Sequence, residues 1–331
     1  MRAELLPSEQ IERIIALRRF PGFARLRPQE LAAIAAFTEA RFFPKGSVLT
    51  EPGRPSQEIF LLVEGSVGEL DGGVEVRRWT GQDAIGGMAA LTQDPCGQHY
   101  VALEDTEAFS LNYEDMVDVF EDHFSILVQV LGGMSRALLD TRRALGFDAG
   151  YEPPAEPERA PHSLARLSLV DKILMMRNQQ DLGKQDVEVA AELARNAIEW
   201  RYPAGTELWA AGDAADHYLF IVAGCVEGLV PGEAAAQGEP ARSAQRLRLG
   251  ASSSIGIMDA IAAVPRWYHA VAETDVVVLR IEVSDLLDIL EDHTELALNM
   301  LRMLASTVLA QRRRLAKRGL ESARPPPPAL S

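Results

Sequence analysis

The chain has 331 residues and a formal net charge of −15, and 47% of its residues are hydrophobic. This length suits about two domains, each large enough to bury a core without disulfides or metals. The acidic charge argues against a nucleic acid partner. No stretch reaches the roughly 20 apolar residues that span a bilayer, and acidic residues stand at the start, where a signal peptide needs a basic region. We expect a cytoplasmic protein that binds neither nucleic acid nor a membrane.

The first half is predicted to run helix, strands, helix. Apolar residues have helical spacing over residues 11–17, and a second short helix follows Pro28. Short apolar runs bounded by glycine, such as residues 59–63, then predict the strands of a barrel or sandwich. Apolar residues at three- and four-residue spacing return over residues 115–143, which predicts helical structure again.

The second half repeats this order because the chain contains a duplicated domain. At an offset of 159, Pro44, Gly46, Leu49, Gly53, Val63, Gly65 and Val67 recur as Pro203, Gly205, Leu208, Gly212, Val222, Gly224 and Val226. At an offset of 170, Gly86, Met88, Pro95, Ala102 and Asp105 recur as Gly256, Met258, Pro265, Ala272 and Asp275. The offset grows by 170 − 159 = 11 residues. We assign this insertion to the stretch around residues 231–243, on a surface hairpin of the second repeat.

Two segments lack the apolar patterning of a folded domain. Residues 146–161 are crowded with proline and glutamate, which favours an extended linker. The end of the chain is proline-rich and is expected to be solvated. We therefore expect a first domain over 1–145, a linker over 146–161, a second domain over 162–318 and a tail over 319–331.

Several motifs together point to a known family. The first repeat carries a turn at Pro44-Lys45-Gly46, a strand that ends in Val63-Glu64-Gly65, and the segment Ile85-Gly86-Gly87-Met88. In this order they resemble the cyclic-nucleotide-binding domain family, which includes the catabolite activator protein and the regulatory subunit of protein kinase A. The resemblance covers residues 9–145 and 165–316. It implies a fold that is mainly β with α, with two tandem jelly-roll β-barrels that are each flanked by N- and C-terminal helices.

The resemblance also implies where a nucleotide would bind. In the family, a Gly-Glu-Leu-Ala-Leu segment and a later Pro-Arg-Ser/Thr-Ala segment hold the cyclic phosphate and the ribose, because helix N–H groups and the arginine face the phosphate. In the first repeat, Gly86, Gly87 and Met88 stand in the first segment, and Gly87 replaces the glutamate. Cys96 replaces the arginine. We expect this first site to be vestigial.

The second repeat keeps half of the pattern. The candidate ligand-binding residues are Gly256, Ile257, Met258, Arg266 and Trp267. Ile257 replaces the glutamate, and Trp267 and Tyr268 replace the small residues after the arginine. Asp259 stands where a small residue should face the phosphate. Two interpretations stay open: Arg266 binds an anionic ligand, with an aromatic ring stacked on its base, or it pairs with Asp259 in a filled pocket.

No other pattern points to chemistry. His123 and His293 each follow a Glu-Asp pair but lack the converging ligands that a metal needs, and no catalytic motif appears. We expect a non-enzymatic regulatory protein with no cofactor, for which cAMP or cGMP is the ligand to test. The alternative is a ligand-independent scaffold. A protein partner would bind the helices that flank the barrels, and a homo-oligomer is compatible with the sequence.

Overall fold

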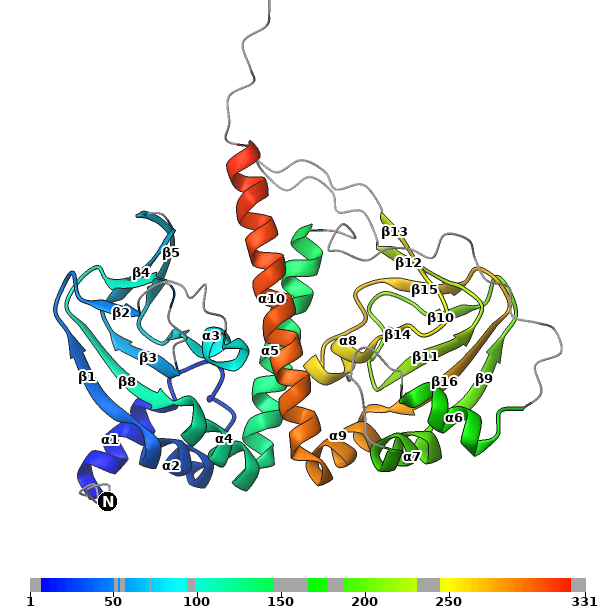
Figure 1. Cartoon of the computed structure of the whole chain (residues 1–331), viewed down its shortest axis with the longest axis horizontal. Coiled ribbons are helices and arrows are strands. Elements are labelled where there is room, and N and C mark those ends of the chain that lie inside the picture. Colours follow the sequence, from blue (N-terminus) through cyan, green and yellow to red (C-terminus); the bar gives the residue numbers. More distant parts are fainter. Residues whose placement is uncertain are drawn as a thin grey trace, which may run out of the picture. The chain divides into compact units, whose positions relative to one another are not determined.

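The chain folds into two compact units. The computed structural model describes residues 7–50, 53, 57–71, 73–93, 99–145, 166–177, 187–230 and 245–322 (Figure 1). The first unit spans Met1–Val130 and the second spans Leu131–Ser331. The predicted linker, the predicted insertion, Cys96 and residues 323–331 of the predicted tail lie outside the described residues, while residues 319–322 of that tail continue helix α10 (Thr294–Ser322). The domain boundaries given above therefore stay predictions.

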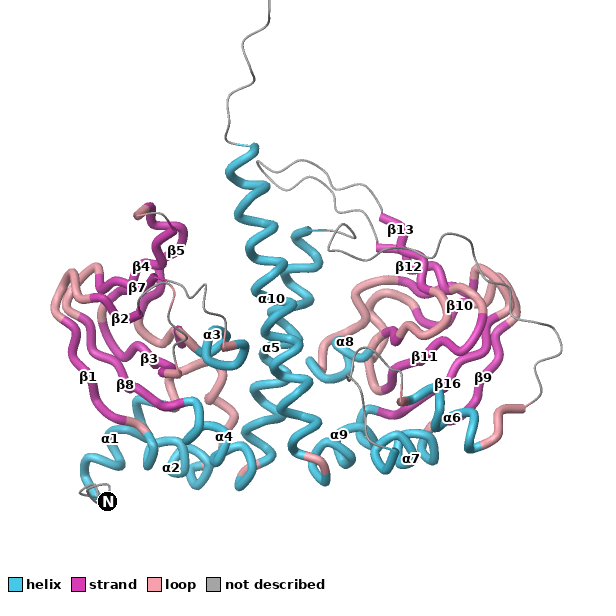
Figure 2. The backbone as a smooth tube through the Cα atoms, viewed as in Figure 1, coloured by secondary structure: helices cyan, strands magenta, loops and turns pink. Residues whose placement is uncertain are grey.

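The first unit has helices before and after its strands, as Figure 2 shows. Its elements are α1 (Pro7–Leu17), α2 (Pro28–Phe37), β1 (Glu39–Phe43), β2 (Val48–Thr50), β3 (Glu58–Glu64), β4 (Ser66–Asp71), β5 (Val74–Thr80), β6 (Ala84–Ile85), α3 (Gly87–Thr92), β7 (His99–Ala102), β8 (Thr106–Asn112), α4 (Tyr113–Asp122) and the start of α5 (Phe124–Leu145). The strands form two antiparallel sheets, in the orders β1-β8-β3-β6 and β2-β7-β4-β5.

The second unit has the same elements in the same order. They are α6 (Leu169–Met176), α7 (Val187–Asn196), β9 (Ile198–Tyr202), β10 (Glu207–Trp209), β11 (His217–Ala223), β12 (Val226–Val230), β13 (Gln245–Leu249), β14 (Ser254–Ile255), α8 (Ile257–Ala262), β15 (His269–Ala272), β16 (Val276–Glu282), α9 (Val283–Asp292) and α10 (Thr294–Ser322). Its sheets are β9-β16-β11-β14 and β10-β15-β12-β13. The predicted pair of jelly-roll barrels with flanking helices is confirmed.

The duplication extends to strand register. Phe60 pairs with Ile85 in the first barrel, and Leu219 pairs with Ile255 at the same place in the second. The register also shifts at the same point, before Glu64 in β3 and before Ala223 in β11. A one-residue slip would turn every inward side chain to the other face, so the shared bulge keeps both cores in place.

Two equivalent turn glycines explain why the sequence keeps glycine after each central strand. Gly65 has a φ of 93° and Gly224 has a φ of 90°, in the left-handed region that side chains disfavour. A Cβ atom on Gly65 would lie 2.6 Å from the carbonyl oxygen of Asp105. A Cβ atom on Gly224 would overlap the carbonyl oxygen of Asp275. Both turns therefore need glycine for its conformation and for its small size.

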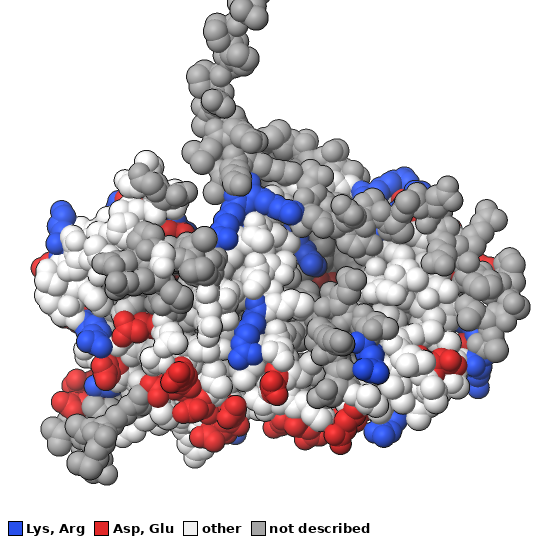
Figure 3. Space-filling view, in the orientation of Figure 1, with Lys and Arg blue, Asp and Glu red and all other residues white. Residues whose placement is uncertain are grey.

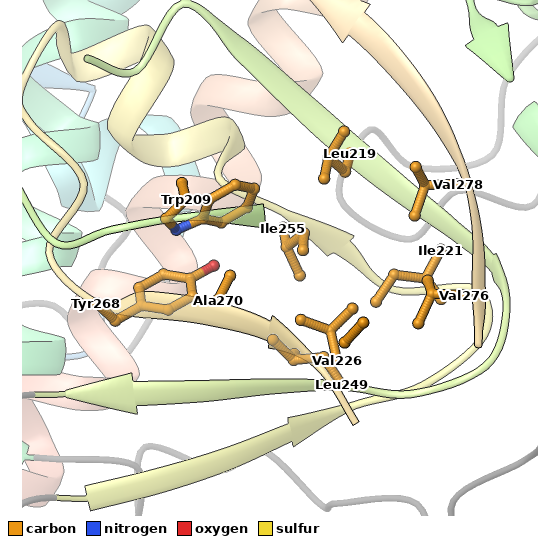
Figure 4. Packing of buried hydrophobic residues seen from close by; sticks show 11 residues of the cluster. Trp209, Leu219, Ile221, Val226, Leu249, Ile255, Tyr268, Ala270, Val276 and Val278 are labelled. Carbon is orange, nitrogen blue, oxygen red and sulfur yellow. The ribbon is translucent and has the colours of Figure 1, made fainter. Parts of the chain in front are cut away.

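The core of the second barrel lies between its two sheets (Figure 4). Leu219, Ile221 and Val278 come from one sheet, and Val226 and Ala270 come from the other. Two large aromatic side chains, Trp209 and Tyr268, close one end of this cluster, with their ring centroids 5.7 Å apart in an edge-to-face arrangement. The barrel is thus filled by its own side chains.

Each barrel is followed by two helices, whereas the apolar spacing of the sequence predicted one continuous helical stretch. His123 ends α4 with a φ of −137°, and His293 ends α9 with a φ of −124°. The next helix begins at the following residue in each case. The apolar spacing continues across both breaks because the short helix and the long helix each bury one face. None of the described helices is long and apolar enough to cross a membrane.

Helix α5 starts in the first unit and ends in the second. Its last 15 residues, 131–145, belong to the second unit, where they pack beside α10 (Figure 1). Thr141 of α5 donates a hydrogen bond of 2.8 Å to the buried side chain of Gln311 of α10. Leu138 and Leu139 are buried there, as are Leu304 and Val308 of α10.

Candidate functional site

The candidate site of the second repeat is built around α8. Gly256 precedes this helix with a φ of 79°, so the chain turns sharply from β14 into the helix. Ala263 follows the helix with a φ of 51°, which ends it after six residues. The candidate residues Ile257 and Met258 form its first turn, and both are buried. The short helix therefore presents little free side chain surface to a ligand.

Arg266 lies inside the barrel, and its side chain is 0% exposed. Its Nη1 atom donates a hydrogen bond of 2.8 Å to the carbonyl oxygen of Gly256, and its Nη2 atom donates to the carbonyl oxygen of His217. The guanidinium also lies over the ring of Trp209, with 4.4 Å from Cζ to the ring centroid. These contacts hold the guanidinium in one orientation, turned toward the protein.

Asp259 is the charged neighbour of Arg266. Its Oδ2 atom lies 3.8 Å from Nη1 of Arg266, and both side chains are buried. This distance makes an ion pair but is too long for a hydrogen bond. Among the described residues, neither Oδ2 of Asp259 nor Nε of Arg266 has a hydrogen-bond partner.

Burial opposes the charge on both members of this pair. Burial raises the pKa of Asp259 to about 6, although Arg266, Arg142 and Arg143 favour the carboxylate. Burial also lowers the pKa of Arg266, and Asp259 counteracts part of that change. The mutual attraction of the two groups therefore only partly offsets the cost of removing them from water.

Aromatic side chains surround the pair. Trp209 is 4% exposed, and its ring meets His217 and Tyr268 edge to face. Tyr268 is buried as well, which raises the pKa of its hydroxyl. The candidate residue Trp267 is half-buried, and its ring lies edge to face with that of Tyr268, at 5.3 Å between centroids. Trp267 therefore contacts Tyr268 and is not stacked flat on an open pocket.

Trp209 is the residue that sequence reasoning missed. It lies on β10, 57 positions before Arg266, and only barrel closure brings the two together. One signal was available: Trp209 stands where the first repeat has Thr50, at the offset of 159. A large aromatic residue at a position that is small and polar in the sister repeat indicates a local change in what fills the barrel.

The outer side of α8 rests on the second half of α5. Arg136 donates a hydrogen bond of 3.1 Å from Nε to the carbonyl oxygen of Ala262, at the end of α8. The hydroxyl of Ser135 lies 3.8 Å from the sulfur of Met258. A Cβ atom on Gly132 would lie 3.3 Å from the carbonyl oxygen of Ile261. Helix α8 is thus fixed by Arg266 inside the barrel and by α5 outside it.

The first repeat has the same frame with different contents. Gly86 has a φ of 82° and precedes α3, as Gly256 precedes α8. Gly87 and Met88 are half-buried, and a Cβ atom on Gly87 would meet only Ile59, at 3.8 Å. Cys96 lies outside the described residues, so the structure does not place it beside α3.

Other polar groups form no further centre. Among the described residues, no group of three or more His, Cys, Asp or Glu side chains could hold a metal ion. His293 lies 3.1 Å from Glu192, as a link between α9 and α7. Cys225 is buried, which raises the pKa of its thiol to about 11, and its sulfur contacts Glu273.

The helices that follow each barrel carry exposed acidic side chains at equivalent positions. Glu121 and Asp122 of α4 recur as Glu291 and Asp292 of α9, and all four are exposed. Figure 3 shows acidic side chains where Figure 1 places α4 and α9, and basic side chains along the upper part of α10. Exposed acidic side chains therefore recur at equivalent positions of the helices that follow the two barrels.

The sequence matches one protein family in both units. The family model of the cyclic nucleotide-binding domain matches residues 40–123 and residues 199–293. These two segments contain the strands of each barrel together with α3 and α8. No curated protein sequence matches the chain.

Three of the solved structures that are similar to this chain differ in identity and in coverage. One is a mutant regulatory subunit of a cAMP-independent protein kinase A from Trypanosoma brucei, bound to cAMP, with 14% identity, coverage of 97% of each chain and a TM-score of 0.33. Another is such a subunit from Trypanosoma cruzi, bound to guanosine, with 15% identity, coverage of 88% of this chain and 92% of that one, and a TM-score of 0.34. A cyclic nucleotide-binding-like protein from Brucella abortus has 30% identity over 37% of this chain and 98% of its own, with a TM-score of 0.30.

Proposed function

Because the chain belongs to the cyclic nucleotide-binding domain family and contains the domain twice, we propose that it is a non-enzymatic regulatory protein. In this proposal the first site is vestigial, and the second retains its arginine in an internally paired form. The output is a change in contacts between the flanking helices and a protein partner. One observation carries the proposal: the side chain of Arg266 is 0% exposed and already bound to Gly256, His217 and Asp259.

Energetics support a closed second site. To bind a cyclic phosphate, Arg266 would have to give up two carbonyl contacts, and the ligand would approach the carboxylate of Asp259. Each hydrogen bond that the charged guanidinium gives up costs about 1.5–3 kcal/mol, and the carboxylate of Asp259 would repel the phosphate. A charge-assisted hydrogen bond to phosphate returns about 1.5–3 kcal/mol. The exchange is unfavourable as long as Trp209 and Asp259 stay in place.

Thermal melting of the full chain with cAMP and with cGMP tests the proposal. A ligand at 100 times its dissociation constant stabilises a protein by about 2.7 kcal/mol. We expect neither nucleotide to shift the Tm of the wild type. A shift in the wild type that disappears in Arg266→Ala would contradict the proposal and make the second barrel a nucleotide sensor.

The proposed partner surface is the set of acidic helices after the barrels. Asp288 and Glu291 of α9 are exposed and point to a basic contact surface on the partner. Charge reversal at both positions, in Asp288→Lys/Glu291→Lys, should reduce partner capture by the full chain. Glu207→Lys on β10 reverses an exposed acid of the barrel and serves as the matched control. Equal capture by both variants and the wild type would contradict the assignment to α9.

The ligand-independent scaffold remains the second candidate function. It shares the closed pockets and the helical contact surface but has no input at the second barrel. The filled core around Trp209 and Tyr268 favours it. The two candidates differ at Arg266. In the regulatory protein this arginine can bind an anion, and in the scaffold it cannot.

A further inference from the structure

We propose that Asp259 is a built-in substitute for an anionic ligand of Arg266, and that Trp209 covers the guanidinium and keeps external anions out. The inference rests on the proposed function, because it explains how the second site is closed. The ligand class itself follows from the family, whose arginine faces a phosphate; what is new is the pair of side chains that closes this position, and inorganic phosphate is the probe for it. The closed state is then held by two side chains and is not a property of the whole fold.

The guanidinium keeps capacity for an anion. An arginine has five N–H donors, and the two carbonyl oxygens that accept from Arg266 are uncharged. Its Nε–H group donates to no described residue. A fully buried guanidinium needs a negative partner, because neutral acceptors do not cancel its charge. Asp259 is the carboxylate placed within 4 Å to do so.

Asp259 meets this need only in part. Its Oδ2 atom lies 3.8 Å from Nη1 of Arg266 and accepts from no described residue. An oxyanion with several acceptor oxygens can approach a guanidinium at hydrogen-bond distance and with two parallel bonds. Asp259 therefore supplies the negative charge of such a ligand but not its hydrogen bonds. An oxyanion could replace it as the partner of Arg266.

Trp209 supplies the cover. Its ring lies 4.4 Å from Cζ of Arg266, and its outermost ring carbon would lie 3.3 Å from a Cβ atom on Gly256. His217 and Tyr268 hold the ring edge to face. The ring therefore occupies the space above the guanidinium that a ligand would need, while it contributes a cation–π contact.

The first repeat supplies the replacement residues. At the offsets of 159 and 170, Trp209 corresponds to Thr50 and Asp259 to Ala89, while Arg266 corresponds to Cys96. One repeat thus has the cation with its cover and internal anion, and the other has small residues and no cation. Trp209→Thr/Asp259→Ala transfers two first-repeat residues into a barrel that retains Arg266.

The test is thermal melting of the full chain in inorganic phosphate, against potassium chloride at equal ionic strength. Phosphate stabilises folded proteins in general, so the wild type should show only this general difference between the two salts, which serves as the baseline. Trp209→Thr/Asp259→Ala should melt lower in chloride, and phosphate at roughly 100 times its dissociation constant should raise its Tm by about 5–10 °C. Adding Arg266→Met should abolish that rise. Trp200→Thr removes a 44% exposed tryptophan from β9 and should leave the response to phosphate the same as in the wild type.

Each outcome decides the inference. A folded double variant whose phosphate shift does not exceed that of the wild type overturns it, as does an excess shift that persists without Arg266. If the double variant does not fold, Asp259→Asn keeps the size of the side chain and removes only its charge. A phosphate shift above that of the wild type in Trp209→Leu/Asp259→Asn, which removes the ring but keeps an apolar side chain, then supports the inference, and its absence overturns it. The proposed function is tested separately, by wild-type protein with cyclic nucleotide, so the two failures are distinguishable.

Discussion

Asp259 and Arg266 are each harder to ionise in the folded protein than in water, yet they are buried side by side. A single buried charge in a barrel of this kind would neutralise or draw in water. As a pair, the two groups limit each other's cost, because each lowers the penalty for the charge of the other. The protonation of Asp259 should therefore affect the stability of the second unit.

The stability of the second unit should depend on pH through Asp259. Its pKa of about 6 lies above its ordinary value of 3.8, so the folded state binds this proton more tightly than the unfolded state does. The stabilisation is fully present below about 3.8 and is lost as the pH rises through about 6. The Tm of the wild type, measured relative to Asp259→Asn, should thus rise as the pH is lowered from about 7 to about 4.

Matched melts of the two proteins in the same buffers provide the measurement. Asparagine does not titrate, and all other carboxyl groups are common to both proteins, so their effects cancel in the difference. A difference in Tm that stays constant over this range, or that falls toward low pH, would show that Asp259 is ionised and solvated in the folded protein.

The local part of the candidate site could be predicted from the sequence, and the distant part could not. Asp259 and Arg266 are seven positions apart, on a short helix and the turn after it, so their proximity follows from the local chain. Trp209 approaches Arg266 only because β10 pairs with β15 across the barrel. Strand pairing of this kind depends on the register between segments that are far apart in the sequence. The residue pattern of one sequence does not determine that register.

At the scale of elements, the turn glycines were the most informative part of the sequence. Their repeated spacing predicted two barrels because glycines such as Gly65 and Gly224 are required by backbone conformation and by close approach to a neighbouring strand. The helix breaks at His123 and His293 were not predicted. Histidine has no strong preference for ending a helix, and the apolar spacing runs through both positions.

Gly224→Ala should destabilise the second unit far more than Gly205→Ala. Both glycines have positive φ angles, 90° at Gly224 and 83° at Gly205. A Cβ atom on Gly205 meets nothing within 4 Å, so its cost is the conformational penalty of about 1–2 kcal/mol. A Cβ atom on Gly224 adds an overlap with the carbonyl oxygen of Asp275, which should bring the cost to about 2–5 kcal/mol.

Urea unfolding of the full chain and the two variants checks this ranking. The comparison controls for the loss of backbone freedom, because alanine replaces glycine in a left-handed turn in both variants. Equal losses at the two positions would mean that the strand beside Gly224 moves aside without cost.

At the scale of the molecule, the compact unit does not begin where the sequence composition changes. The proline- and glutamate-rich segment predicts a second domain that starts at residue 162, and this boundary stays a prediction; the second compact unit includes residues 131–145 of α5 as well. The composition identifies a segment that cannot form a core, but it says nothing about which core the preceding helix joins. Arg136 and Thr141 link this helix to α8 and α10.

A fragment of residues 131–322 should therefore be more stable than one of residues 162–322. The shorter fragment lacks Leu138 and Leu139, which are 1% and 2% exposed. Each fully buried leucine contributes about 1.5–3 kcal/mol, and its removal also uncovers the apolar side chains that it contacts. Chemical denaturation and light scattering of the two fragments give the comparison. Equal stability would mean that α10 needs no covering from α5.

The placement of α5 also has a consequence for how the protein is made. Thr141 and its partner Gln311 are 170 positions apart, so a ribosome that adds about 5–20 residues per second completes α10 roughly 10–30 s after it has finished α5. The first barrel can fold in that interval, while Leu138 and Leu139 wait for their neighbours. The nascent chain thus carries this apolar helix end without its partner helix α10 for about half of its synthesis.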